Sequence, residues 1–287
     1  MAQDTRAAHS RLDLLMLAVM TADAVTCEIE GGIAHVRLNR PDKLNALTLD
    51  TLDTLIATAR RLSRDRSLRG VMLSGSGDSF CAGLDFATVL KEPPRVAAAF
   101  TPRPWRREGT NTFQEACWAW RRVPVPVVAA VQGHCFGGGL QIALGADFRF
   151  TTADAQWSVL EARWGLIPDM SGIASLSQLV GIDTAKRLTM TGEVISGERA
   201  VALGLATEVA ENPYAAGLAL VEQIVTRSPD SVAAAKRLFD RTWTRGPRHT
   251  FARERVEQAW LLATHNTAIA RKAAFEKAAP RFELRRR

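Results

Sequence analysis

The chain has 287 residues, of which 47% are hydrophobic and 23% are charged, which predicts one large or two small globular domains with a substantial core. Its 4 cysteines show neither CxxC nor His-pair spacing, which excludes a disulfide framework and a zinc site. We therefore expect reduced thiols, a cytoplasmic location and no bound metal.

The net charge of +7 is concentrated near the C-terminus. Residues 241–287 hold 12 Lys or Arg and 4 Asp or Glu, whereas the remainder is close to neutral, with 25 basic and 26 acidic residues. Such a segment can meet a phosphate-bearing ligand, nucleic acid or simply water. Aromatic residues do not alternate with this charge as they do in RNA-recognition patterns, so a nucleic-acid partner is not expected.

Residues 1–22 are expected to form an N-terminal extension. Their apolar stretch, residues 12–20, is too short to span a bilayer, which takes about 20 residues, so we expect no membrane partner. Asp13 interrupts the stretch and a strand pattern follows at once, which favours a dispensable helix over a signal peptide.

Strand and helix patterns then alternate along the chain. Apolar and polar residues alternate on both sides of Gly31 and Gly32, which predicts a β-hairpin. Thr48 is a candidate N-cap for a following helix, and residues 70–75 are expected to form a short buried strand. Residues 91–109 contain four prolines and five Lys or Arg, which predicts a mobile loop or lid.

The next segments continue this alternation. Residues 110–122 are expected to be helical, residues 123–131 to form a strand entered through prolines, and residues 147–150 to form another strand. After residue 170 the pattern is almost entirely helical. Alternating strands and helices predict β-α-β units with parallel strands, which is an α/β fold.

Two glycine turns are the strongest functional signal. "SFCAGLDF" (79–86) and "GHCFGGGLQIAL" (133–144) each join a strand end to a helix start through glycine. Helix N-termini offer unpaired N–H groups, and glycine lets another group approach the backbone. The two turns could therefore form an oxyanion hole, or the glycines could only permit tight packing. Neither turn matches a nucleotide-binding fingerprint or a G-x-S-x-G elbow.

These turns, together with "LNRPDKLNAL" (38–47) and "TGEVISGERAVALGLATEV" (191–209), resemble the crotonase superfamily of enoyl-CoA hydratases and isomerases. The resemblance covers residues 24–283. It implies a spiral core of β-β-α units over residues 23–209 and a helical trimerisation region over residues 210–287. It also implies a homotrimer or hexamer that binds acyl-CoA thioesters, with coenzyme A as part of the substrate and no separate cofactor.

The resemblance also assigns roles to individual residues. The backbone N–H groups of Leu84 and Gly138 would hold the thioester oxygen. Family hydratases use two glutamates, which fall on Gln141 and Glu161 here, and an amide cannot exchange a proton at neutral pH. Asp169 matches the aspartate of dienoyl-CoA isomerases, although it could instead cap the following helix. Glu161 and Asp169 would then shuttle a proton along a conjugated acyl chain.

The remaining assignments concern the walls of the site. Gln141 and Trp164 are expected to line the substrate pocket, although tryptophans at such positions are more often core residues. The resemblance places coenzyme A beside Lys43, Asn45, Ala46, Phe275 and Lys277, the last two sometimes reaching a neighbouring subunit. The acyl pocket is expected to be walled by Trp105, Trp118 and Trp120.

Three functions follow in order of preference. The first is an isomerase that shifts a double bond in an enoyl- or dienoyl-CoA, because Glu161 and Asp169 are both present and residue 141 is not an acid. The second is a trans-2-enoyl-CoA hydratase in which Glu161 is the principal acid and base and Gln141 holds water. The third is a non-catalytic binder of CoA or RNA.

Overall fold

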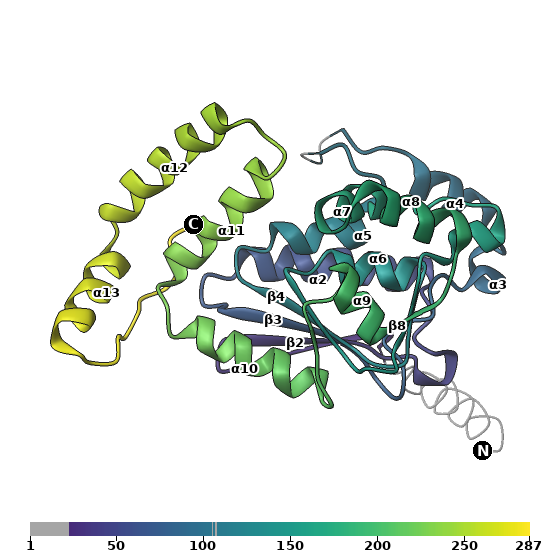
Figure 1. The fold of residues 1–287 in the computed structure, drawn as a ribbon, viewed down its shortest axis with the longest axis horizontal. Coiled ribbons are helices and arrows are strands. Elements are labelled where there is room, and N and C mark those ends of the chain that lie inside the picture. The colour runs from purple at the N-terminus through teal and green to yellow at the C-terminus, as the bar shows by residue number, and fades with distance from the viewer. Residues whose placement is uncertain (1–22, 105, 107) are drawn as a thin grey trace, which may run out of the picture.

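A computed structural model of the chain describes residues 23–104, 106 and 108–287. The expected N-terminal extension and Trp105 lie outside the described residues. The described part is an α/β core from which the last helices project, as Figure 1 shows. The structure confirms that strands and helices alternate up to residue 170. It also confirms that the chain is mainly helical after that point, where only two short strands occur among the described residues.

The main sheet has six strands in the order β1-β2-β3-β4-β6-β9. Their bounds are β1 (Val25–Glu30), β2 (Ile33–Leu38), β3 (Gly70–Gly75), β4 (Val127–Val131), β6 (Phe148–Thr151) and β9 (Glu208–Val209). The first two strands form the predicted hairpin, in which Gly31 and Gly32 adopt positive φ values of 55° and 82°. All other neighbours in this sheet are parallel, as expected from strands separated by helices.

A second, smaller sheet joins β5 (His134–Phe136), β7 (Gln156–Ser158) and β8 (Ile195–Ser196). Strands β5 and β7 are parallel, and β7 and β8 are antiparallel. An isolated bridge between Cys81 and Cys135 attaches this sheet to the chain that leaves β3. The two glycine turns are therefore fixed next to each other by backbone pairing.

Helices cover both faces of the main sheet (Figure 1). On one face lie α2 (Leu49–Arg64), α5 (Thr112–Trp118) and α6 (Gly138–Leu144), and α10 (Pro213–Val225) covers the other. Thr48 caps α2 as predicted, because its hydroxyl accepts from the Thr51 backbone N–H at 3.2 Å. The inner side of α2 is buried, and each fully buried leucine there stabilises the fold by about 1.5–3 kcal/mol.

The predicted loop over residues 91–109 is only partly correct, because it contains α4 (Pro93–Phe100). Proline suits the first turn of a helix, where its missing N–H would have no partner. Phe100 packs against Phe113 of α5, with ring centroids 4.7 Å apart, and this contact holds the helix to the core.

The other helices connect these layers. They are η1 (Pro41–Lys43), α3 (Phe86–Val89), η2 (Ala119–Arg122), η3 (Leu160–Trp164), α7 (Gly172–Leu179), α8 (Ile182–Thr191) and α9 (Gly197–Leu203). The C-terminal region consists of α11 (Pro229–Thr242), α12 (Pro247–Leu262) and α13 (His265–Glu276).

The C-terminal helices form an arm beside the core (Figure 1). After α13 the chain returns to the core, where the Arg285 backbone N–H donates to the Arg66 carbonyl at 3.1 Å. The Arg286 N–H donates to Asp230, at the start of α11, at 2.7 Å. The arm exposes large apolar side chains, including Phe239 and Trp243 at 63% and 62% exposure. Its role in trimerisation stays a prediction.

Candidate active site

The two glycine turns contact each other. Gly83 has a φ of 97°, and a Cβ atom there would lie 3.0 Å from the Phe136 carbonyl oxygen and 3.7 Å from the Gly138 nitrogen. Gly137, in the second turn, has a φ of 51°. Both positions therefore favour glycine, because L residues rarely adopt these dihedrals and at residue 83 a side chain would crowd the facing backbone.

The backbone around the turns leaves two N–H groups unused. The Leu47 N–H donates to the Gly83 carbonyl and the Leu47 carbonyl accepts from the Asp85 N–H, each at 2.8 Å. The N–H of Leu84, which lies between Gly83 and Asp85, takes part in neither bond. Gly138 is the first residue of α6, where helical N–H groups have no partner within the helix. Within residues 23–104, 106 and 108–287, neither N–H donates a hydrogen bond to the protein. Whether they hold a thioester oxygen stays a prediction.

Asp85 fixes the first turn. Its carboxylate accepts from the Thr88 N–H at the start of α3 and forms an ion pair with Arg40, both at 3.1 Å. Burial alone would raise the pKa of Asp85, but the hydrogen bonds from Arg40 and Thr88 lower it overall. The turn is thus held by a carboxylate that is ionised at neutral pH.

Glu161, in η3, lies against the second turn. A Cβ atom on Gly137 would be 3.4 Å from Glu161 Oε1. Glu161 Oε2 is buried and has no hydrogen-bond partner within the part of the chain that the structure describes. Burial, with a smaller contribution from the charge of Asp169, raises the pKa of Glu161 despite a hydrogen bond from Gln141. A carboxyl group with a raised pKa holds its proton more readily than an exposed glutamate, which suits a role in proton transfer.

Gln141, which is 1% exposed, connects the pieces of the site. Its Oε1 accepts from the backbone N–H groups of Met170 and Gly172, each at 2.8 Å, and its Nε2 donates to Glu161 Oε1 at 2.6 Å. Two N–H donors can face only an oxygen, so they fix the orientation of the amide. The carbonyl oxygen has no capacity left for water, and any water would have to use the second N–H.

Asp169 does not cap α7, so that alternative is wrong. The N-cap of α7 is Ser171, which has a left-handed φ of 70° and makes no side-chain cap hydrogen bond. The chain therefore turns between Asp169 and the helix. Burial raises the pKa of the half-buried Asp169 carboxyl. Its neighbour Met170 covers the second turn, since a Cβ atom on Gly138 would lie 2.8 Å from the Met170 sulfur.

An exposed apolar surface flanks the first turn. Trp164 is 62% exposed and packs on Phe86, with ring centroids 5.2 Å apart, so the sequence expectation of a core residue is wrong here. Leu166 and Ile167 in the same segment are 49% and 68% exposed. Phe86, Leu166 and Ile167 were not among the residues that the sequence predicted to line the site.

The tryptophans expected around the acyl chain are placed differently. Trp120 is fully buried in the core, so its predicted contact with an acyl group is wrong. Trp118 lines a separate pocket, where the Arg121 guanidinium stacks on its ring at 4.6 Å. Trp105 lies outside the described residues.

The residues expected to bind coenzyme A fall into two groups. Lys43 and Ala46 lie in the loop around η1, where Asn45 is buried and donates to the Ser76 and Ser79 carbonyls at 2.9 and 2.7 Å. Asn45 thus holds the loop rather than presenting its side chain. In Figure 1, α13 lies at the end of the molecule opposite to α3. Phe275, 87% exposed, and Lys277 are therefore remote from this site in a single chain.

Other chemistries find little support in the described residues. Burial raises the pKa of the Cys81 thiol to about 12, which makes it a poor nucleophile. Within residues 23–104, 106 and 108–287, no three His, Cys, Asp or Glu side chains are grouped as a metal site. In the same residues no helix has the length and apolar character needed to cross a membrane.

Known proteins that are similar to this chain include hydratases and an isomerase that are named for CoA thioesters. The family model for enoyl-CoA hydratase/isomerase matches residues 28–285. The chain is 32% identical to (E)-benzylidenesuccinyl-CoA hydratase of Thauera aromatica, covering 74% of this chain and 80% of the relative. It is 30% identical to the mitochondrial Δ(3,5)-Δ(2,4)-dienoyl-CoA isomerase of Mus musculus, covering 71% and 64%. An enoyl-CoA hydratase structure from a Polaromonas species has a TM-score of 0.80 at 27% identity, covering 90% of this chain and 99% of that one.

Proposed function

Because the chain belongs to the enoyl-CoA hydratase/isomerase family, we propose that it is an acyl-CoA isomerase that shifts a double bond in an enoyl- or dienoyl-CoA thioester. The observation that carries the proposal is the pair of carboxyl groups beside the glycine turns. Glu161 and Asp169 both have raised pKa values. Gln141 of α6 is hydrogen-bonded to both segments: its amide N–H donates to the Glu161 carboxylate, and its oxygen accepts from the backbone N–H of Met170, the residue after Asp169.

The reaction requires one proton to leave carbon and another to arrive further along the chain. The thioester oxygen accepts from the N–H groups of Leu84 and Gly138, which stabilise the enolate charge as it forms. One carboxylate removes a proton from the acyl chain, the double bond moves, and the other carboxylic acid returns a proton at the distant carbon. No atom is gained or lost overall.

Gln141 determines where the proton of Glu161 resides. Its Nε2 donates to Oε1, so that oxygen acts as an acceptor and the proton must be carried by Oε2. Oε2 is the buried oxygen that has no partner among the described residues. The amide therefore leaves one defined oxygen of Glu161 available for proton transfer.

Hydration of a trans-2-enoyl-CoA is the second candidate, with Glu161 activating the water. It is favoured by the similarity to a hydratase, which is slightly higher in identity and coverage than the similarity to an isomerase. The absence of an acid at residue 141 favours isomerisation, because only Glu161 would serve the water from that side. We further propose a cytoplasmic homotrimer or hexamer, on account of its free cysteines and its exposed apolar C-terminal arm.

The test compares substrates on the purified protein. 3-Enoyl-CoA and 3,5-dienoyl-CoA should be converted to conjugated products, which are followed by absorbance, and Asp169→Asn should abolish this conversion. Rapid hydration of crotonyl-CoA without any isomerisation would overturn the proposal, as would an Asp169→Asn variant with full isomerase activity. Asp154→Asn, which changes an acid in a turn outside the site, is the matched control.

A further inference from the structure

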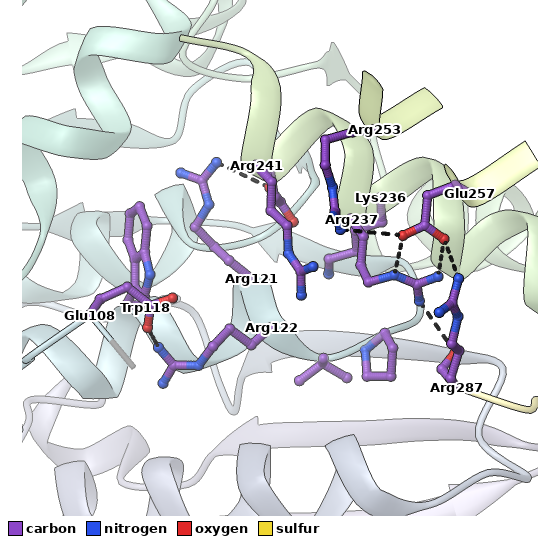
Figure 2. A pocket seen from close by; sticks show the side chains of 13 residues that line it. Glu108, Trp118, Arg121, Arg122, Lys236, Arg237, Arg241, Arg253, Glu257 and Arg287 are labelled. Atoms are coloured by element: carbon purple, nitrogen blue, oxygen red, sulfur yellow. Dashed lines mark hydrogen bonds and ion pairs between the residues drawn. The ribbon is translucent and has the colours of Figure 1, made fainter. Parts of the chain in front are cut away.

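A concave site lies between the core and the C-terminal arm (Figure 2). Its cavity measures about 520 Å³. One wall comes from η2 and the residues around it, and the other from α11, α12 and the end of the chain. None of the residues that line it belongs to the candidate active site. Its cationic side chains are those of Arg121, Arg122, Lys236, Arg237, Arg241, Arg253 and Arg287.

Positive charge is in excess in this pocket. Among the described residues, seven cationic and three acidic side chains line it, the acids being Glu108, Asp240 and Glu257, which leaves an excess of four (7 − 3). Two further acids stand behind the wall, where Asp147 pairs with Lys236 at 2.7 Å and Glu115 pairs with Arg122 at 2.6 Å. When Asp147 and Glu115 are added to the three lining acids, the cationic side chains still outnumber the acidic ones by two (7 − 5).

The excess is sharpest around Glu257, whose side chain is only 4% exposed. Its carboxylate contacts Arg237 at 2.8 Å, Arg287 at 3.0 Å and Arg253 at 3.9 Å. One carboxylate side chain thus faces three arginines, of which Arg237 also donates to the Arg287 main-chain oxygen at 3.3 Å. Like charges held this close repel one another, and a bound anion would offset that cost.

The side chains also have the chemistry and the room for such an anion. Six of the seven cations are arginines, whose planar forks match the oxygens of a phosphate group. In Figure 2, Arg241 extends from α11 into the space between the two walls. The volume falls within the range of about 300–1,000 Å³ that is usual for small-molecule sites.

We propose that this pocket binds a phosphate group, carried either by inorganic phosphate or by the CoA moiety of a ligand. The proposal assigns a role to part of the basic C-terminal segment. It is independent of the proposed isomerase activity, because phosphate binding is measured without turnover.

The experiment titrates inorganic phosphate into the full-length protein by calorimetry at constant ionic strength, with chloride as the reference anion. Saturable binding is expected. The double variant Arg241→Gln/Arg253→Gln should weaken it about tenfold or more, since charge-assisted hydrogen bonds are lost. The matched control, Arg248→Gln/Arg255→Gln, removes two exposed arginines outside the pocket lining and should bind phosphate normally.

Competition then distinguishes the sources of the phosphate. Displacement of phosphate by CoA but not by dephospho-CoA would identify the 3′-phosphate of CoA, and displacement by neither would identify free phosphate. The proposal is overturned if phosphate does not saturate, or if the control variant loses as much affinity as the pocket variant. A change of oligomeric state in the pocket variant with unchanged phosphate binding would also overturn it, and would make the pocket a subunit contact.

Discussion

Glu161 in the candidate active site and Glu257 in the basic pocket show how the hydrogen-bonding partner of a carboxyl group changes its pKa. Glu161 is hydrogen-bonded by the neutral amide of Gln141, and burial raises its pKa. Burial would raise the pKa of Glu257 too, but Arg237 and Arg287 lower it overall. The first environment suits proton transfer, whereas the second suits a fixed charge.

The largest expected effect is on turnover. Glu161→Gln removes the proton carrier and should reduce kcat for double-bond migration by about 10²–10⁴-fold, the usual contribution of a general acid or base. Steady-state kinetics and circular dichroism measure activity and folding separately. Glu198→Gln, at an exposed position on α9, should leave kcat unchanged. A Glu161→Gln variant with more than a tenth of the wild-type activity would contradict the assignment.

Glu257→Gln should instead destabilise the fold. Removing this carboxylate leaves the three arginines without their shared partner, at a cost of about 3 kcal/mol in the free energy of unfolding. The lowered pKa of Glu257 means that its contribution is present above the unfolded-state pKa and is lost as pH falls through the folded-state pKa. Urea denaturation across pH should show the wild-type advantage at neutral pH shrinking in acid. A difference that is independent of pH would contradict this account.

Changing the amide to an acid should make Glu161 more basic still. Gln141→Glu places a second carboxylate against Glu161 Oε1, and like charges should move the acid limb of the pH–rate profile up by about one pH unit. The same variant should raise the hydration of crotonyl-CoA. Gln141→Met adds no charge but removes the hydrogen bond that lowers the pKa of Glu161, so its acid limb should also move up, by less than in Gln141→Glu. An unmoved limb in Gln141→Glu would show that residue 141 does not contact the titrating acid.

The smallest expected effect is a gain in stability for Glu161→Gln. Because the pKa of Glu161 is raised, its ionised form destabilises the folded protein once pH exceeds the unfolded-state pKa. Thermal unfolding at neutral pH should therefore show stabilisation of at most about 1 kcal/mol, which vanishes in acid. Equal or lower stability at neutral pH would indicate that the Gln141 hydrogen bond outweighs the cost of burial.

Local sequence signals predicted much of the fold. The hairpin at Gly31-Gly32 and the Thr48 cap depend on neighbouring residues, and both are confirmed. The glycine pattern identified the turns at Gly83 and Gly138, which the structure brings together, and the family resemblance assigned their N–H donors. These features follow from short-range backbone preferences, which a single sequence carries directly.

Features that depend on distant contacts were missed. Gln141 contacts Glu161, Met170 and Gly172, which lie 20 to 31 residues away, so no local pattern reveals its role. The burial of Trp120 and the exposure of Trp164 are likewise decided by packing between elements. The Asp169 cap was a reasonable local prediction, but the left-handed turn at Ser171 moved the start of α7.

The return of the chain from α13 to the core means that the C-terminal arm is fastened at both ends. Arg285 and Arg286 bind beside the start of α11, so a proteolytic cut between α12 and α13 would leave each fragment attached. A doubly tethered arm cannot swing freely, and its exposed apolar side chains are presented in a nearly fixed array. Assembly with other subunits would then require little additional ordering of this region, which lowers the entropic cost of association.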